Sequence, residues 1–183
     1  FSEVFIKTKG FDIYDRNYQN ARPEHAFPEQ YNQYILGSLP SSQIDVAYKG
    51  YVYGINMNSV QQSQTMFARR VFEMMASNTI TVGNYSRGVK NYFGDLTICT
   101  DDEKTMEAYL QEYCNNSNIY RKYRLAGLRN VLSYHLYEDR LDYIVSKVFG
   151  ISLKHKPIVS LVSRCANHED CQLKQHKDSH KPL

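Results

Sequence analysis

The chain has 183 residues, 42% of them hydrophobic, and a formal net charge of +3. These values suit one globular domain with its own core and give no reason to expect a nucleic-acid partner. No apolar run is long enough to span a bilayer, no signal peptide opens the chain, and the four cysteines are spaced too unevenly for a secreted disulfide framework. We therefore expect a cytoplasmic protein with reduced thiols and, because the first residue is Phe, a piece of a longer protein.

Apolar runs alternate with polar and amphipathic segments between residues 11 and 150. Strands are predicted over 11–14, 34–36, 51–58, 79–83 and 96–99, with an irregular polar connection over 17–31. Helices are predicted over 42–48, 65–78, 89–93, from Thr100 onward, and over 119–149 with a division near Gly127 or Ser133. The expected end signals are Ser42 and Ser63 as N-caps, a capping box of Thr100 with Glu103, and Gly150 as the final stop.

This order predicts an α/β domain over residues 1–150, Rossmann-like, with a parallel sheet and helices on both faces. Residues 151–183 are expected to be a tail or the truncated start of a following domain. Ligands of such sheets bind outside the carboxyl ends of the strands. The loops at that edge and the helix beside it offer Arg16, Ser38, Asn56, Asn58, Ser86, Arg87 and Gly88, with Arg69, Arg70 and Glu73 nearby.

The helix predicted over 65–78 carries its charges on one side. Helical spacing places Phe67, Val71, Met74 and Met75 on one face, and Arg69, Arg70 and Glu73 on the opposite face. By themselves the charges indicate only an ion-paired surface, just as the loop residues suit ordinary turns and strand ends.

Arginines beside a glycine-containing turn suit a diphosphate, and a carboxylate on the next helix suits ribose hydroxyls. The sequence contains no Gly-x-Gly-x-x-Gly fingerprint, P-loop, nucleophile elbow or clustered carboxylate pair, which disfavours NAD, ATP and hydrolase sites.

The segment from about Phe11 to Gly150 resembles the C-terminal, nucleotide-sugar-binding domain of GT-B glycosyltransferases, in particular the group-1 subset of spore-maturation (CgeB-like) type. Five blocks in the family's order carry the resemblance: 37–40, 54–58, 70–78, 86–88 and 126–140.

The resemblance implies roles for the matching residues. Glu73 would hold the ribose of the donor, and Arg70, with Arg69, would face its diphosphate. Backbone amides of Ser86 to Gly88 would bind the same phosphates, and the base would rest on Gly37 and Ser38. His135 and Arg140 are expected to pack structurally. The donor is expected to be a nucleotide-diphosphate sugar, most simply a UDP-sugar, without a metal cofactor.

The sequence departs from the family in two places. Thr65 stands where many relatives carry a carboxylate near the transferred sugar, and Asn78 replaces the glycine of a turn, a change that the left-handed tolerance of Asn allows. The first change puts a retaining mechanism in doubt. Because GT-B active sites lie between two domains, we expect the fragment to bind a nucleotide-sugar weakly and to transfer no sugar without its N-terminal partner.

The last residues offer two readings. Residues 156–163 resemble the opening strand of a family-2 (GT-A) glycosyltransferase module. The alternative is a zinc site, although its cysteine spacing is wider than usual and lysines surround it. Its ligands would come from Cys165, His168, Cys171, His176 and His180.

The leading hypothesis from sequence is the donor-binding half of a glycosyltransferase that builds a bacterial surface or spore glycan, with peripheral membrane association of the full protein. One alternative is a non-catalytic binding or scaffold module that has lost transfer, which Thr65 supports. A receiver-type regulatory domain is weaker, because no acidic cluster follows successive strands.

Overall fold

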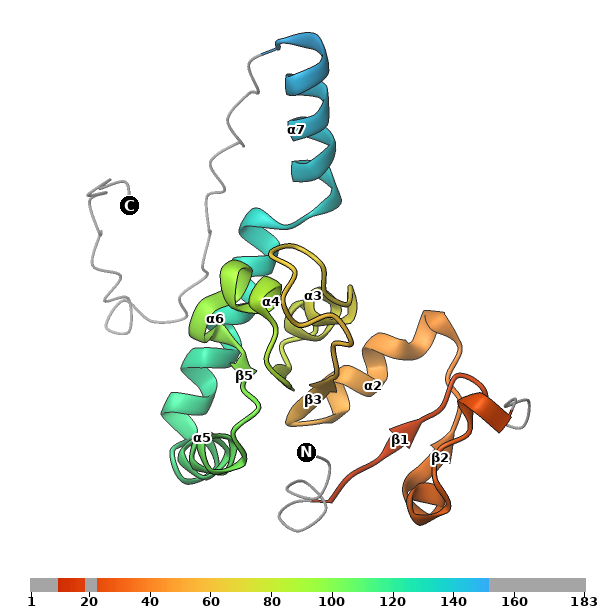
Figure 1. Cartoon of the computed structure of the whole chain (residues 1–183). Coiled ribbons are helices and arrows are strands. Elements are labelled where there is room, and N and C mark those ends of the chain that lie inside the picture. Colours follow the sequence, from red (N-terminus) through yellow and green to blue (C-terminus); the bar gives the residue numbers. More distant parts are fainter. Residues whose placement is uncertain (1–9, 19–22, 152–183) are drawn as a thin grey trace, which may run out of the picture.

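The computed structural model describes residues 10–18 and 23–151, which form short parallel strands surrounded by helices (Figure 1). The strands are β1 (Ile13–Tyr14), β2 (Ile35–Gly37), β3 (Tyr53–Asn56), β4 (Ile80–Gly83) and β5 (Ile98–Cys99). The α-helices are α2 (Ile44–Gly50), α3 (Arg70–Ala76), α4 (Arg87–Phe93), α5 (Glu103–Asn115), α6 (Ser117–Tyr134) and α7 (Tyr137–Phe149). The 3-10 segments are η1 (Pro23–His25), η2 (Glu29–Tyr34), η3 (Ser41–Gln43) and η4 (Gly94–Leu96). The predicted Rossmann-like α/β class is confirmed.

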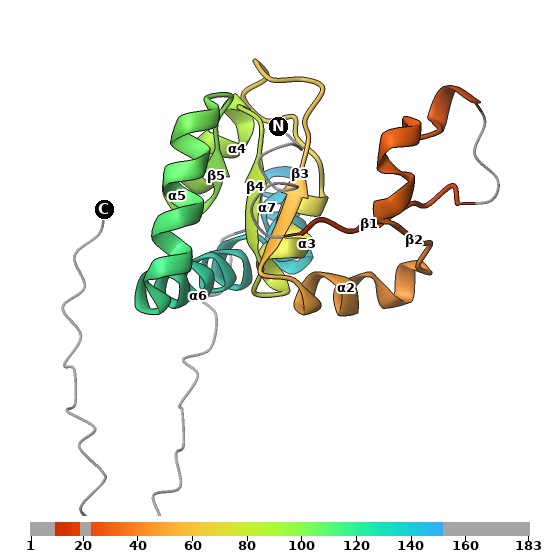
Figure 2. The same ribbon diagram turned by 90° about the horizontal axis from the view of Figure 1, so that it is seen from below.

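The strands form two parallel sheets, where the sequence predicts one. β1 pairs with β2, and the other strands pair in the order β3-β4-β5. Figure 2 shows the β1–β2 pair to one side of the three-stranded sheet, with α2 joining the two parts.

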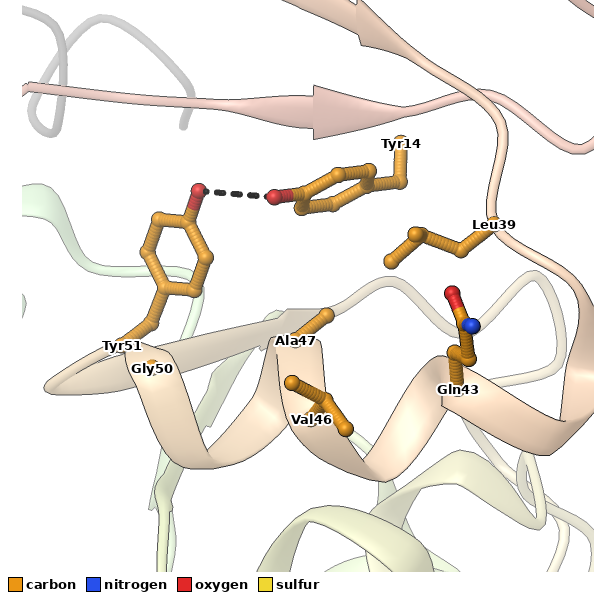
Figure 3. Close-up of a pocket in the computed structure, with 7 residues that line it drawn as sticks. All are labelled: Tyr14, Leu39, Gln43, Val46, Ala47, Gly50 and Tyr51. Carbon is orange, nitrogen blue, oxygen red and sulfur yellow. Dashed lines mark hydrogen bonds between the residues drawn. The ribbon is translucent and has the colours of Figure 1, made fainter.

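Tyrosine side chains bridge the space between the two sheets. Tyr51 lies just before β3 and donates its hydroxyl to Asp12 at 2.7 Å, while the hydroxyls of Tyr14 and Tyr51 lie 3.4 Å apart (Figure 3). Between β1 and α2 is a cavity of about 390 Å³, lined by Tyr14, Leu39, Gln43, Val46, Ala47, Gly50 and Tyr51 (Figure 3). Side chains, and not a backbone ladder, therefore connect β1 to the segment before β3.

The core lies on both faces of the three-stranded sheet. Successive residues of a strand point to opposite faces. On one face the buried cluster contains Ile80, Val82 and Ile98 of the strands with Met106, Leu110 and Tyr113 of α5. On the other face it contains Val71 and Met75 of α3, Val89 and Phe93 of α4, Cys99 of β5, and Val131 of α6. The apolar face predicted for the 65–78 segment is therefore buried at Val71, Met74 and Met75.

The predicted helix over 65–78 is wrong at its start, because α3 begins only at Arg70. The hydroxyl of Ser63 accepts from the amide of Met66 at 3.0 Å, and the side-chain oxygen of Asn58 accepts from the amide of Ala68 at 3.2 Å. These side-chain bonds compete with helical bonds and hold residues 63–68 as a loop.

Other helix ends also differ from the predictions. Asp102 caps α5, and its carboxylate accepts from the amide of Thr105 at 2.9 Å, so the predicted Thr100–Glu103 box is wrong. Ser42 lies inside η3 and caps nothing. The last helical stretch divides at His135 and Leu136, next to the predicted position near Ser133. Gly127 lies within α6 instead, where its Cβ would be 3.1 Å from Met75 Cε. Gly150 ends α7 with φ 65°, as predicted.

Candidate functional site

The exposed side of α3 carries the ion pair that the sequence predicts. Arg69 Nε donates to Glu73 Oε1 at 2.7 Å, and the side chains are 76% and 35% exposed. The hydroxyl of Tyr48, from α2, lies 3.5 Å from Glu73 Oε2. Burial, followed by the charge of Glu73, raises the pKa of Tyr48, so this tyrosine keeps its proton and acts as a donor. Glu73 is thus held in place while its oxygens stay partly open to solvent.

Arg69 and Glu73 line a pocket of about 580 Å³ between α3, α4 and the junction of α6 with α7. The pocket also receives Thr65 from the loop before α3. Its full lining is Thr65, Phe67, Arg69, Phe72, Glu73, Ala76, Tyr92, Val131, His135, Leu136, Tyr137 and Arg140.

Aromatic rings form the wall of this pocket. The ring centroids of Phe67 and Phe72 lie 5.4 Å apart, and His135 lies 5.4 Å from Phe72. The guanidinium carbon of Arg140 lies 5.3 Å from the centroid of the same Phe72 ring. Burial, and then the nearby Arg140 charge, lowers the pKa of His135 below its usual 6.5, so the imidazole is neutral at pH 7. The pocket thus combines flat apolar surface with arginine and glutamate groups.

The carboxyl end of the three-stranded sheet, by contrast, is closed by bonds within the chain. The amide group of Asn84 accepts from the Asn58 N–H at 2.8 Å and donates to the Asn58 carbonyl at 2.9 Å. The buried Cys99 thiol donates to the Asn84 carbonyl at 3.3 Å and accepts from the amide of Ser86 at 3.2 Å. Burial raises the pKa of Cys99, which agrees with a protonated thiol. Asn58 and Ser86 therefore make structural contacts here, and Asn56 is 1% exposed.

The loop before α3 covers the turn expected to bind phosphate. The amide of Arg87 donates to the Gln61 carbonyl at 2.7 Å, and the Ser86 hydroxyl caps α4 by accepting from Val89. A Cβ on Gly88 would lie 2.9 Å from the Phe67 ring, which shows how closely the loop packs on this turn. A phosphate at these amides would require the loop to move, although the Arg87 side chain is exposed.

The remaining predicted residues lie at the end of the smaller sheet. Arg16 is exposed in the turn after β1, and Ser38 is exposed just after β2. Gly37 has φ 119°, a conformation that favours glycine, and its carbonyl accepts from the amide of Asp15 at 2.8 Å. Because the sheet is divided, these residues do not share the pocket that Arg69 and Glu73 line.

The structure thus brings Arg69 and Glu73 together with residues that the sequence did not single out for binding. Phe72, Tyr92 and Tyr137 belong to this set, as do His135 and Arg140, for which we expected packing. The sequence could have indicated these residues only through the segment from His135 to Arg140. Its contribution to the pocket becomes apparent once α6 is known to end just before His135. Arg70 is exposed on the first turn of α3, outside the lining of this pocket. The binding roles of all these residues stay predictions.

Within residues 10–18 and 23–151, no group of three or more His, Cys, Asp or Glu side chains is arranged to hold a metal ion. The candidate zinc ligands of the last residues, and the strand predicted near 156–163, lie outside the described residues. Over the same described ranges, no helix combines the length and apolarity needed to cross a bilayer.

Parallel strands with helices on both faces define a Rossmann-like α/β domain. A family model described as glycosyl transferase-like matches residues 6–146. The chain therefore belongs to the glycosyl transferase-like family and contains a glycosyltransferase-like domain. No curated protein and no solved structure matches the chain.

Proposed function

We propose that this domain binds the nucleotide-sugar donor of a GT-B glycosyltransferase of the group-1, spore-maturation (CgeB-like) type. The donor is a nucleotide-diphosphate sugar, with UDP as the first choice of nucleotide, and the acceptor is a glycan or surface group. A second Rossmann-like domain of the full protein binds that acceptor. Membership of the glycosyl transferase-like family supports the reaction class.

One observation carries the donor-binding proposal: the Arg69–Glu73 pair lines a pocket of about 580 Å³ with aromatic walls. A carboxylate has lone pairs for several donors, so Glu73 can accept from ribose hydroxyls while it stays bonded to Arg69. Aromatic side chains suit the flat faces of a base or a sugar. Arginines neutralise the diphosphate leaving group, a task that a divalent ion performs in other enzymes.

The Glu73→Ala variant tests the ribose contact. We expect it to bind UDP at least about tenfold more weakly, since a hydrogen bond to a charged group contributes about 1.5–3 kcal/mol. Loss of Glu73 also frees Arg69, which by itself would favour a phosphate, so weaker binding identifies a hydroxyl contact. Calorimetric titration with UDP, GDP, ADP and dTDP, followed by 2′-deoxy-UDP, measures this effect.

The matched control is Glu107→Ala, which removes an exposed carboxylate from α5 and leaves affinity unchanged. Wild-type protein should prefer UDP to 2′-deoxy-UDP, and Glu73→Ala should lose that preference. Equal affinities of the wild type and Glu73→Ala for every nucleotide would contradict the proposal.

The alternative is a donor-binding module without transfer activity. Thr65, which replaces a carboxylate of many relatives, lines the same pocket as Glu73 and favours this alternative. Saturable nucleotide binding with no release of sugar from any UDP-sugar, in the full protein and with its acceptors, would support the module. Sugar transfer by the full protein would exclude it.

A further inference from the structure

Two arginines line the pocket, Arg69 and Arg140. Among the residues that the structure describes, no carboxylate forms an ion pair with Arg140. Arg140 belongs to the first turns of α7, and its exposed side chain lines the pocket. The charged groups of the lining are Arg69, Glu73 and Arg140, and Arg69 is bonded to Glu73 at 2.7 Å. His135 adds no charge at neutral pH because its pKa is lowered. One positive charge therefore remains, and it belongs to Arg140.

The surroundings of Arg140 hold its guanidinium without neutralising it. The guanidinium carbon lies 5.3 Å from the centroid of the Phe72 ring, within the range of a cation–π contact. Such a contact fixes the plane of the group and leaves its N–H edge available to an anion. The nearest acidic neighbour in the sequence, Asp139, uses one carboxylate oxygen to accept from the amide of Leu136 at 3.0 Å.

The position of Arg140 near the start of α7 gives the helix no electrostatic stabilisation. The first turn of a helix has a positive partial charge, so a cation there is electrostatically unfavourable. Glu138 and Asp139 of the same turn have the favourable charge, whereas Arg140 does not. An anion bound at the pocket would offset this cost.

We propose that Arg140 is an anion-binding residue that holds a phosphoryl group of the donor's diphosphate. Guanidinium groups bind phosphate oxygens through paired N–H bonds, and the exposed Arg140 side chain is open to such an anion. The pocket then has two functions: Arg140 binds the diphosphate and Glu73 binds the ribose. The identity of the anion as a diphosphate rests on the proposed function. The position of Arg140 in the pocket does not depend on that proposal.

The test compares pyrophosphate, uridine and UDP as ligands of wild type, Arg140→Ala, Arg140→Lys and Arg121→Ala. Arg121 is an exposed arginine of α6 outside the pocket lining and serves as the matched control. We expect Arg140→Ala to weaken the binding of UDP and of pyrophosphate about tenfold, which corresponds to about 1.4 kcal/mol. The binding of uridine should be unchanged. Arg140→Lys should restore part of the affinity, and Arg121→Ala should match the wild type. Circular dichroism and thermal melts of each variant show that it is folded.

The outcomes separate this inference from the proposed function. If Arg140→Ala binds UDP as tightly as the wild type while Glu73→Ala binds it weakly, the Arg140 assignment is wrong and donor binding stands. If Arg140→Ala loses pyrophosphate but Glu73→Ala retains full UDP affinity, Arg140 binds an anion and the ribose assignment fails. If the wild type binds neither pyrophosphate nor any nucleotide, both are overturned.

Discussion

Replacement of Gly83 by Ala is expected to cost about 3 kcal/mol of the free energy of unfolding, the upper end of the usual range for overpacked cores. Gly83 is the last residue of β4, where it stands opposite Asn56 of β3. A Cβ at this position would press on the backbone carbonyl oxygen of Asn56, far inside van der Waals contact. A backbone oxygen in a buried ladder cannot rotate away as a side chain does, so the two strands must separate.

Chemical denaturation measures this loss, with Gly50→Ala as the control. A Cβ on Gly50, the last residue of α2, meets nothing within 4 Å, and an alanine in a helix is favoured over glycine by about 0.5–1 kcal/mol. Gly50→Ala should therefore be neutral or slightly stabilising. A denaturation midpoint of Gly83→Ala equal to that of the wild type would show that β3 and β4 do not pair as described.

Asn84→Ala is expected to cost about 3 kcal/mol. The Asn84 side chain bonds both the N–H and the carbonyl of Asn58, at 2.8 and 2.9 Å, in a buried environment. Alanine would leave two buried backbone groups unpaired, each at about 1–3 kcal/mol. Because this pair closes the carboxyl edge of the three-stranded sheet, the same variant is expected to loosen the loop before α3.

The control for Asn84 is Asn91→Ala. Asn91 is exposed and makes one side-chain bond, to the Gln64 carbonyl at 3.3 Å, so its loss should stay within about 0.5 kcal/mol. Hydrogen exchange of the Ala68 and Arg87 amides measures how far the loop opens. The Ala68 amide bonds to the Asn58 side chain, and the Arg87 amide bonds to the Gln61 carbonyl. Equal stability of Asn84→Ala and Asn91→Ala would mean that the Asn58–Asn84 pair does not close this edge.

The alternation of apolar runs with amphipathic segments was sufficient to predict the α/β class. Buried strands such as β4 are continuous apolar runs, and the stripe of α5 repeats at helical spacing, so both are visible locally. The start of α3 was not visible, because Asn58 reaches ten residues along the chain to hold the Ala68 amide. The two sheets are linked by side chains, including the contact of Tyr51 with Asp12, and no periodicity shows such a link.

The candidate site was predictable only where it depends on local spacing. Arg69 and Glu73 are four residues apart, and their ion pair follows directly from helical geometry. Arg140 reaches the same pocket only because α6 ends at Tyr134 and the chain turns before α7. The sequence places that break near Gly127 or near Ser133 and does not decide between them. A shift of one residue in a helix is enough to rotate a side chain away from the pocket. The placement of the Ser86–Gly88 turn beneath the loop likewise depends on packing between distant segments.

The central claim is that a nucleotide binds at the pocket between α3 and the α6–α7 junction. Titration of a nucleoside diphosphate into the isotopically labelled chain, followed by NMR of assigned amides, tests it most directly. Binding at this pocket would give saturable shifts centred on Arg69, Glu73, His135, Tyr137 and Arg140. Shifts confined to the cavity between β1 and α2, or none at millimolar nucleotide, would contradict it.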